Sequence, residues 1–230
     1  MKKQILILIT IVLGFGVLYS CKKMDDTYRQ FIEDGEIIYI GRADSLKVRG
    51  GELRAEVSWL LISDPKVHEY KLTWNNGTDS IINTVTKTDQ VDTVRVVIED
   101  LEEKTYEFTI TMFDKHGNTS VKSNVIGKVF GPRYESSIVN RAFLTAILKD
   151  SDVTINWTKA EDQLVYSLLT YTDSSGKETT LRVEKDEETT ILSDFPRIGN
   201  FEMVSSFLPD STALDTFYTA PVTYTPIESD

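Results

Sequence analysis

The chain has 230 residues, one cysteine, two histidines and a formal net charge of −11. This acidity disfavours a nucleic-acid partner, because phosphate binding requires concentrated positive charge, and we attribute it to solubility. The single cysteine excludes a disulfide within the chain.

The N-terminal segment has the layout of a bacterial secretory signal. Two lysines, at positions 2 and 3, precede an apolar stretch from Ile5 to Tyr19. This stretch is short for a bilayer span, which needs roughly 20 residues. We therefore predict a signal peptide over residues 1–20. Its removal takes away both lysines, so the net charge of the mature chain falls from −11 to −13.

The residues Leu18-Tyr19-Ser20-Cys21 resemble the lipobox of bacterial lipoproteins. In that family the cysteine sulfur receives a diacylglyceryl group and the signal is cut before it. The resemblance implies lipidation of Cys21 and attachment to a membrane through its acyl chains, since stable anchoring takes more than one chain. Tyr19 departs from the small residue common at that lipobox position. The alternative is a signal-anchor with an incidental buried thiol.

Acidic residues follow the cysteine at Asp25 and Asp26. They resemble the surface-export signal of Bacteroidetes lipoproteins, which implies an outer-membrane protein that faces the cell surface; the alternative is the periplasmic face. Residues 21–36 are expected to form the lipid-anchored tether. A short helix is expected only at residues 25–33, because no segment after residue 34 shows a sustained helical period.

From Ser45 to Phe130 the chain consists of short alternating runs between turn signals, which is typical of an all-β sandwich. A hairpin turn is predicted at Asn76-Gly77. Period two places alternate residues of each strand on one face. The residues expected on the core face are Leu53, Ala55, Val57 and Trp59, then Tyr70, Leu72 and Trp74, then Val94, Val96 and Ile98, and finally Tyr106, Phe108, Ile110 and Met112.

The same pattern appears a second time along the chain. Trp157 follows Trp59 by 98 residues, and Phe201 follows Tyr106 by 95 residues. A nearly constant offset indicates a diverged duplication. Glycine and proline interrupt the pattern near residue 131. We therefore predict one sandwich over residues 37–131 and a second, diverged β-sandwich over residues 132–230.

The segment LRAEVSWLLISDPKVHEYKLTW, Leu53 to Trp74, resembles the second and third strands of a fibronectin type III domain. Leu101 with Tyr106 resembles the tyrosine corner of that family, with a spacing one residue shorter than usual. Phe201 stands at the corresponding corner of the second unit and lacks the hydroxyl. The resemblance implies two tandem immunoglobulin/fibronectin type III-like sandwiches.

The segment YRQFIEDGEIIYIGRADSLKV, Tyr28 to Val48, followed by the tryptophan strand, is similar to a family of uncharacterised Bacteroidetes lipoproteins. The resemblance covers roughly residues 24–135. It implies a part in outer-membrane systems that capture and degrade polysaccharides, so the implied partners are a glycan or an uptake complex.

Catalytic chemistry finds little support in the sequence. His68 and His116 are expected to be solvated, and no cysteine is left after lipidation, so we predict no metal site, no cofactor and no catalytic residue. A glycosidase needs only two carboxylates. The acidic clusters, Glu102-Glu103 and Asp186-Glu187-Glu188 among them, are interpreted as solvated charge.

An aromatic residue can bind sugars, because a flat ring stacks on a pyranose face while neighbouring polar groups bond its hydroxyls. Trp74, Asn75 and Asn76 stand where a strand meets its hairpin and form the candidate ligand platform. The alternative, which the phase with Tyr70 and Leu72 favours, places Trp74 in the core. Loops at 63–66, 115–119 and 209–214 are further candidate binding sites.

Four tripeptides resemble the O-glycosylation acceptor pattern of Bacteroidetes envelope proteins. Their acceptor residues are Ser45, Ser80, Thr93 and Ser211.

Three functions are compatible with these observations. The first is a lipid-anchored binding or accessory module that helps in polysaccharide capture, which predicts an exposed aromatic platform or an apolar patch. The second is a passive spacer or protein-interaction scaffold. The third is a glycoside hydrolase accessory or weak hydrolase, which predicts two convergent carboxylates.

Overall fold

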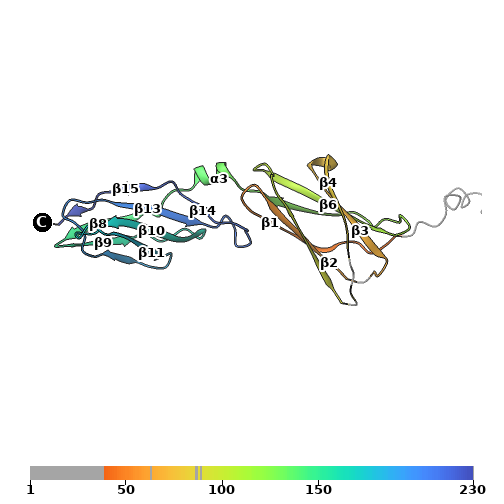
Figure 1. Cartoon of the computed structure of the whole chain (residues 1–230), viewed down its shortest axis with the longest axis horizontal. Coiled ribbons are helices and arrows are strands. Elements are labelled where there is room, and N and C mark those ends of the chain that lie inside the picture. The colour runs from red at the N-terminus through yellow and green to blue at the C-terminus, as the bar shows by residue number, and fades with distance from the viewer. Residues whose placement is uncertain (1–38, 63, 86–87, 89, 230) are drawn as a thin grey trace, which may run out of the picture. The chain divides into compact units, whose positions relative to one another are not determined.

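The computed structural model describes residues 39–62, 64–85, 88 and 90–229 (Figure 1). Residues Ile40–Asp230 form one compact unit. The predicted signal peptide, the tether with Cys21, and the helix expected at residues 25–33 lie outside the described residues. Among the residues described, no helix is long and apolar enough to cross a membrane.

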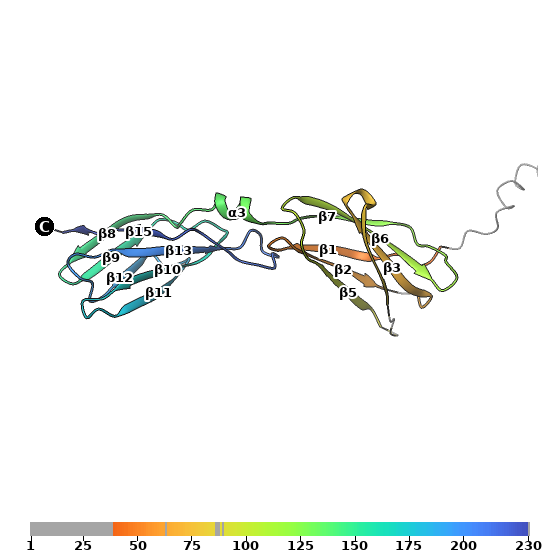
Figure 2. The same cartoon turned by 45° about the horizontal axis from the view of Figure 1, so that its top comes forward.

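Two antiparallel sheets form the first sandwich, one with the strand order β1-β2-β5 and the other with the order β4-β3-β6-β7 (Figure 2). The turn between β3 and β4 contains the 3₁₀ helix η2 (Asn75–Gly77). The strands are β1 (Asp44–Gly50), β2 (Ala55–Leu61), β3 (Val67–Trp74), β4 (Asp79–Thr84), β5 (Asp92–Ile98), β6 (Thr105–Asp114) and β7 (Ser123–Lys128).

The core of the first sandwich follows the predicted alternation. Every second residue of β2 and of β6 is buried, so each strand gives one face to the core. Trp59 is only 1% exposed, and its ring meets that of Tyr70 edge to face at 4.9 Å between centroids. Val94 and Val96 are half-buried and pack against this core. The predicted core faces of β2, β3, β5 and β6 are therefore confirmed.

Leu53 is the exception among the predicted core residues. It precedes β2, has a backbone φ of 50°, and is partly exposed. Its N–H donates to Phe130 O and its carbonyl accepts from Leu101 N–H, both at 2.8 Å. The prediction was wrong here because the chain turns before β2 begins, so the alternation does not extend back to this residue.

The second sandwich has the sheets β12-β9-β8-β16 and β11-β10-β13-β14, with β15 also paired to β13. Its own hydrophobic core includes Trp157, Phe195 and Phe201. The strands are β8 (Phe143–Lys149), β9 (Asp152–Trp157), β10 (Leu164–Thr172), β11 (Glu178–Glu184), β12 (Thr189–Leu192), β13 (Phe201–Phe207), β14 (Phe217–Tyr218), β15 (Val222–Tyr224) and β16 (Ile227–Glu228).

The two sandwiches share one strand order. Strands β8, β9 and β12 take the places of β1, β2 and β5, and β11-β10-β13-β14 repeats β4-β3-β6-β7. The paired landmarks also recur, since Tyr106 and Phe201 stand near the starts of β6 and β13. The expected architecture of two tandem fibronectin type III-like sandwiches is therefore confirmed. The domain limits at residues 37, 131 and 230 stay predictions.

Two local predictions require correction. The six-residue helix α3 (Pro132–Ser137) follows the first sandwich, although no helix was expected after residue 34. It is too short to show a helical period, and Pro132 suits its first position. The hairpin after β3 lies where predicted but is wider than two residues, because Trp74 pairs with Asp79 and both Asn75 and Asn76 have positive φ.

The tyrosine corner forms as the resemblance implied. The hydroxyl of Tyr106 accepts a hydrogen bond from the main-chain N–H of Glu102 at 3.0 Å. Phe201 cannot make this bond; its buried ring stacks instead on Tyr224, with 5.5 Å between centroids. The starts of the corresponding strands β6 and β13 are therefore stabilised differently, by a hydrogen bond in the first sandwich and by ring stacking in the second.

The β13–β14 loop contacts the turn between β1 and β2. Asp215 accepts hydrogen bonds from Arg54 Nε at 2.9 Å and Arg54 Nη2 at 2.5 Å, and from the N–H of Glu52 at 2.8 Å. Leu214 N–H donates to Gly50 O at 2.8 Å. Residues 209–214 were predicted as a candidate binding loop. The loop that contains them makes main-chain and side-chain contacts within the protein.

Candidate functional site

The candidate platform residues lie at one end of the first sandwich. Trp74 ends β3, and Asn75 and Asn76 form the turn that follows. Trp74 is half-buried, and its side chain packs against the first hydrophobic core, as the alternative interpretation expected; the residue also borders a cleft of about 270 Å³. The role of these residues as a ligand platform stays a prediction.

The floor of this cleft, here called the Trp74 cleft, is a row of polar side chains across three strands. Thr73 of β3, Thr109 of β6 and Asn124 of β7 are partners in register and line the cleft. Ser80 of β4 continues the row beside Thr73. Neighbouring strands lie about 4.8 Å apart, so the row presents hydrogen-bonding groups at a spacing that suits the hydroxyls of a sugar.

The polar groups of the Trp74 cleft include donors and acceptors. Asn124 Nδ2 donates to Glu107 Oε1 at 3.0 Å, which leaves the second carboxylate oxygen of Glu107 and the Asn124 carbonyl for a ligand. Lys122 adds a cation and Asn76 an amide to the lining. Asn75 lies in the adjoining turn, where its Nδ2 donates to Asp79 Oδ2 at 2.6 Å. That bond holds the turn in shape.

The four predicted glycosylation acceptors all lie on the surface. Ser45 is at the irregular start of β1, Ser80 in β4, Thr93 in β5 and Ser211 in the β13–β14 loop. Each is exposed, so each is accessible to a modifying enzyme. Modification itself stays a prediction.

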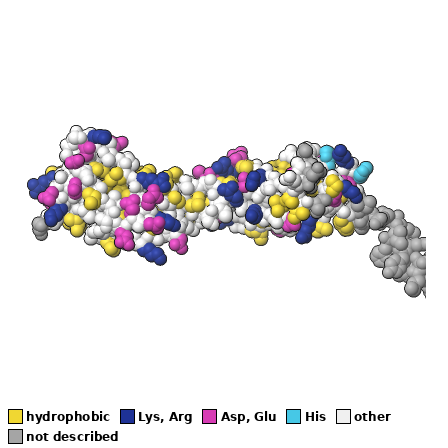
Figure 3. Space-filling view, turned by 90° about the horizontal axis from the view of Figure 1, so that it is seen from below, with side chains coloured by type: hydrophobic (Ala, Val, Ile, Leu, Met, Phe, Trp, Pro, Cys, Tyr) yellow, Lys and Arg dark blue, Asp and Glu magenta, His cyan; other side chains and the backbone are white. Residues whose placement is uncertain are grey.

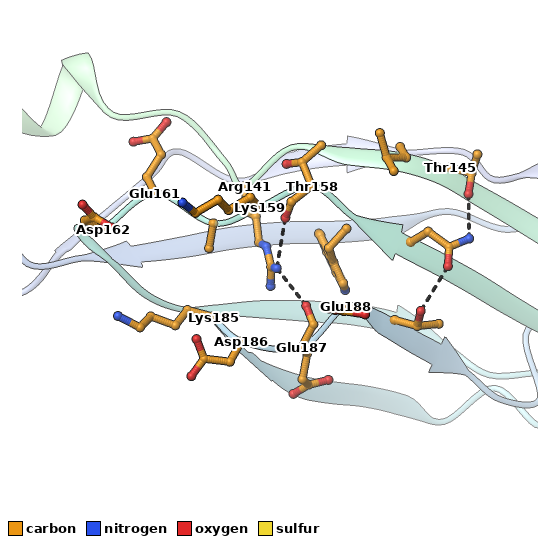
Figure 4. A pocket seen from close by; sticks show the side chains of 15 residues that line it. Arg141, Thr145, Thr158, Lys159, Glu161, Asp162, Lys185, Asp186, Glu187 and Glu188 are labelled. Carbon is orange, nitrogen blue, oxygen red and sulfur yellow. Dashed lines mark hydrogen bonds between the residues drawn. The ribbon is translucent and has the colours of Figure 1, made fainter.

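A larger cleft of about 780 Å³ lies in the second sandwich (Figure 4). Its lining combines five carboxylates with two lysines, and a ladder of hydrogen bonds crosses its wall. In that ladder Asn156 Nδ2 donates to Thr145 Oγ1 at 2.9 Å, and Thr189 Oγ1 donates to Asn156 Oδ1 at 3.1 Å. The sequence did not predict this cleft, because its residues come from four separate segments.

Arg141 is the only buried charge in this larger cleft, here called the Arg141 cleft. Its guanidinium donates to the carbonyl oxygens of Glu184, Thr158 and Glu187 at 3.1, 3.2 and 2.8 Å. It also lies over the ring of Trp157, 4.9 Å from its centroid. Burial lowers the pKa of Arg141. These contacts use the guanidinium to hold strand ends together, so we assign it a structural role.

One carboxylate of the Arg141 cleft has a structural place. Glu187 accepts from Glu184 N–H at 2.8 Å and from Thr190 Oγ1 at 3.2 Å, so its carboxylate closes a turn. Among the described residues, the carboxyl groups with shifted pKa values are all lowered by hydrogen bonds; they are Asp114, Asp173 and Asp215.

The part of the chain that the structure describes also contains no candidate metal site. There, no group of three or more His, Cys, Asp or Glu side chains is placed to hold a metal ion. His116 is exposed in a turn that closes on Asp114, whose Oδ1 accepts from His116 N–H at 2.8 Å. On the face shown in Figure 3, acidic and basic side chains are interspersed.

Solved structures similar to this chain include tandem fibronectin type III domains. The FN1–FN3 domains of chicken CNTN1 are 15% identical, with a TM-score of 0.41, and the match covers 83% of this chain and 66% of that one. A two-domain segment of chicken tenascin is 12% identical, with a TM-score of 0.32, and the match covers 80% of this chain and 98% of that one.

The chain thus spans just under two thirds of the CNTN1 fragment. No curated protein matches it. A family model described as a domain of unknown function, DUF4998, matches residues 21–217 and so includes both sandwiches almost entirely. The chain therefore belongs to the DUF4998 family.

Proposed function

We propose that this protein is an envelope lipoprotein that binds saccharides in the Trp74 cleft and thereby helps to capture polysaccharide at the outer membrane. The observation that carries the proposal is the composition of that cleft. Trp74 borders one edge of the cleft, and the polar row of Thr73, Thr109 and Asn124 lines it. An aromatic residue beside a few placed polar groups is typical of a small-ligand site.

The fold is compatible with a binding or scaffold role. A sandwich of this kind presents its binding residues on loops and on the outer faces of its sheets, positioned by a rigid core. The Trp74 cleft has this construction, because Trp74 itself is fixed by the first core while Asn76 projects from the adjoining turn. A saccharide would therefore meet side chains that are already in place, at a low entropic cost.

The N-terminal sequence supports the location. The signal-like residues 1–20 and the lipobox-like residues before Cys21 favour export and lipidation, and Asp25 and Asp26 favour display at the cell surface. A saccharide site carried by sandwiches on a lipid anchor would lie outside the cell, where polysaccharides are met. Export, lipidation and surface display are inferred from resemblance, and replacement of Cys21 tests the lipid anchor on which they converge.

The test of the function is a glycan array with the soluble fragment from Met24 to Asp230. Trp74→Ala is expected to abolish binding, and Asn124→Ala to weaken it by about fivefold, since one lost hydrogen bond is worth about 1 kcal/mol. Trp74→Phe preserves most of the packing against the core and guards against misfolding. Asn156→Ala is the matched control, because it removes the same amide from the Arg141 cleft.

Three outcomes are informative. Binding that falls in the Trp74 and Asn124 variants but not in Asn156→Ala supports the proposal. Binding that falls only in Asn156→Ala moves the site to the Arg141 cleft. A wild-type fragment that binds no glycan contradicts the saccharide function altogether.

A passive spacer is the second candidate, and the contacts of the β13–β14 loop favour it. Asp215 with Arg54, and Leu214 with Gly50, tie residues of the second sandwich to residues of the first. A spacer benefits from such ties because a flexible joint would not hold a partner at a fixed distance. Absence of glycan binding, together with capture of a neighbouring envelope protein, would favour this function.

A further inference from the structure

A row of polar and aromatic side chains crosses the outer face of one sheet in the second sandwich. Glu184 of β11, Tyr166 of β10, Ser206 of β13 and Tyr218 of β14 are successive partners in register. Side chains at paired positions share one face of a sheet, and Arg182, two residues before Glu184, lies on that face too. We call Tyr166, Arg182, Glu184, Ser206 and Tyr218 the tyrosine surface.

The side chains of the tyrosine surface are held in place by one another. The hydroxyls of Tyr166 and Tyr218 lie 3.3 Å apart, above the fully buried Ser206. The Arg182 guanidinium lies over the Tyr166 ring at 3.8 Å from its centroid, and its Nε donates to Glu184 Oε1 at 2.6 Å. A preordered surface loses little entropy when a ligand binds.

The Tyr218 hydroxyl has two polar neighbours. The Tyr166 hydroxyl lies 3.3 Å away, and either oxygen of this pair can donate, whereas Thr216 Oγ1 donates to Tyr218 at 3.4 Å. These contacts hold the Tyr218 hydroxyl in position at the surface, where it can donate and accept.

The groups of this surface that face solvent are numerous and mixed. Tyr218 is 42% exposed, and the side chains of Arg182 and Glu184 are 52% and 55% exposed. Together they offer an aromatic ring, a hydroxyl, the Nη donors of Arg182 and the second carboxylate oxygen of Glu184. A pyranose presents an apolar face and a rim of hydroxyls, so it complements such a set.

We propose that the tyrosine surface is a second contact for the same neutral saccharide chain, an inference that rests on the proposed function. The ligand is neutral because Arg182 is already paired with Glu184 and the chain carries a net charge of −11, which repels polyanions. A saccharide fits better than an added peptide strand, because the row of side chains runs across the strands from β11 to β14 and not along the free edge of β11.

The experiment uses the full-length lipidated protein in a detergent without a sugar headgroup. It is applied to an array of neutral oligosaccharides, with uronic-acid and sulfated glycans beside them. Tyr218→Phe removes only the hydroxyl and is expected to weaken neutral-glycan binding about fivefold; Tyr218→Ala also removes the ring and is expected to weaken it by tenfold or more. Tyr39→Ala is the matched control, because Tyr39 is a 62% exposed tyrosine.

Asn124→Ala is included as the reporter of the Trp74 cleft. Weaker binding in both Tyr218 variants, with Tyr39→Ala unchanged, supports the inference, whatever Asn124→Ala does. If Asn124→Ala weakens binding while Tyr218→Phe and Tyr218→Ala bind as the wild type does, the inference is overturned and the proposed function stands. Wild-type binding to acidic glycans alone, or to no glycan, also overturns it. Since Tyr218→Phe changes one oxygen atom, misfolding of Tyr218→Ala does not remove the test.

Discussion

Arg141 shows how one buried side chain can organise several strand ends. Its guanidinium satisfies carbonyl oxygens after β9, at the end of β11 and in the turn before β12, and stacks on Trp157. No carboxylate within the described residues lies at ion-pair distance from it. Its charge is therefore balanced by main-chain dipoles, and the residue stabilises the fold without offering the cleft a free cation.

Replacement of Arg141 by Ala is expected to destabilise the second sandwich by about 2–4 kcal/mol, because three carbonyl groups lose their donor and the Trp157 ring loses its packing partner. Arg141→Lys is expected to restore little of this, since an ammonium lacks the planar fork. Urea unfolding measures both. The control is Arg197→Ala, whose exposed ion pair with Glu228 is worth less than about 1 kcal/mol. Equal effects of the two alanine variants would contradict the assigned role.

Tyr106→Phe tests the tyrosine corner. The substitution removes the acceptor of the Glu102 N–H and is expected to cost about 1–2 kcal/mol of unfolding free energy. The second sandwich provides the internal comparison, because Phe201 occupies this place without a hydroxyl. An unchanged urea midpoint in Tyr106→Phe would show that the bond contributes nothing.

At the scale of the element, two turns repeat one construction. The turn after β6 closes on Asp114, whose Oδ1 accepts from the N–H groups of His116 and Asn118 at 2.8 and 2.9 Å. The turn after β10 closes on Asp173, whose Oδ1 accepts from Ser175 N–H and Lys177 N–H at 2.9 and 3.0 Å. An Asp side chain that caps its own turn is a common device, and here both sandwiches use it.

These turns make the stability depend on pH. Hydrogen bonds lower the pKa of Asp114, first through Asn118, and that of Asp173, first through Ser175. A lowered pKa stabilises the fold above the unfolded value of about 3.9, and the stabilisation is lost as the pH falls through the folded pKa. The double variant Asp114→Asn, Asp173→Asn is expected to be less stable at pH 7 and to lose less stability below pH 4.

Urea midpoints between pH 7 and pH 2 check this prediction. Asp162→Asn, at an exposed position, is the control and is expected to keep the acid dependence of the wild type. A double variant whose midpoint falls with pH as steeply as the wild type's would contradict the role of the two turns.

At the scale of the whole molecule, the contacts of Asp215 couple the two hydrophobic cores. Asp215 binds Arg54 and the N–H of Glu52, and Phe217 beyond it meets Phe130 and Tyr134 edge to face at 6.2 and 5.1 Å between centroids. Each core could unfold alone, because each is complete. We expect the contacts between them to make the two described sandwiches unfold as one cooperative unit.

Asp215→Ala is therefore expected to separate one calorimetric unfolding transition into two. The substitution leaves the Arg54 guanidinium and the Glu52 N–H without their acceptor, whereas neither core loses a side chain. Asp210→Ala is the control, because Asp210 lies in the same loop but caps only its own turn at Thr212. Two transitions in the wild type, or a single one in Asp215→Ala, would contradict the coupling.

The anchor is tested on the living cell. Cys21→Ser is expected to abolish incorporation of a labelled fatty acid and to release the protein from the membrane fraction, because the acyl chains have no other attachment point. A Ser20→Ala variant keeps the cysteine and serves as the control. Recovery of Cys21→Ser in the membrane in unchanged amount would contradict lipid anchoring.

The Trp74 cleft shows how far the sequence predicts the site. The sequence predicted Trp74 at the end of a strand and the turn that follows at Asn75 and Asn76. Thr109 and Asn124 were not, because each is one outward residue among many in its own strand and only the register brings it to the cleft. The Arg141 cleft and the tyrosine surface escaped prediction for the same reason.

The sequence by itself determined the class of fold, the repeat and most of the two cores, because burial of apolar side chains at period two is a local property of each strand. Only the tertiary structure decided which polar residues meet. Tyr166 and Tyr218 are 52 residues apart, and Arg54 and Asp215 are 161 apart. Partners so distant are chosen by strand register and loop path, which no local pattern of residues specifies.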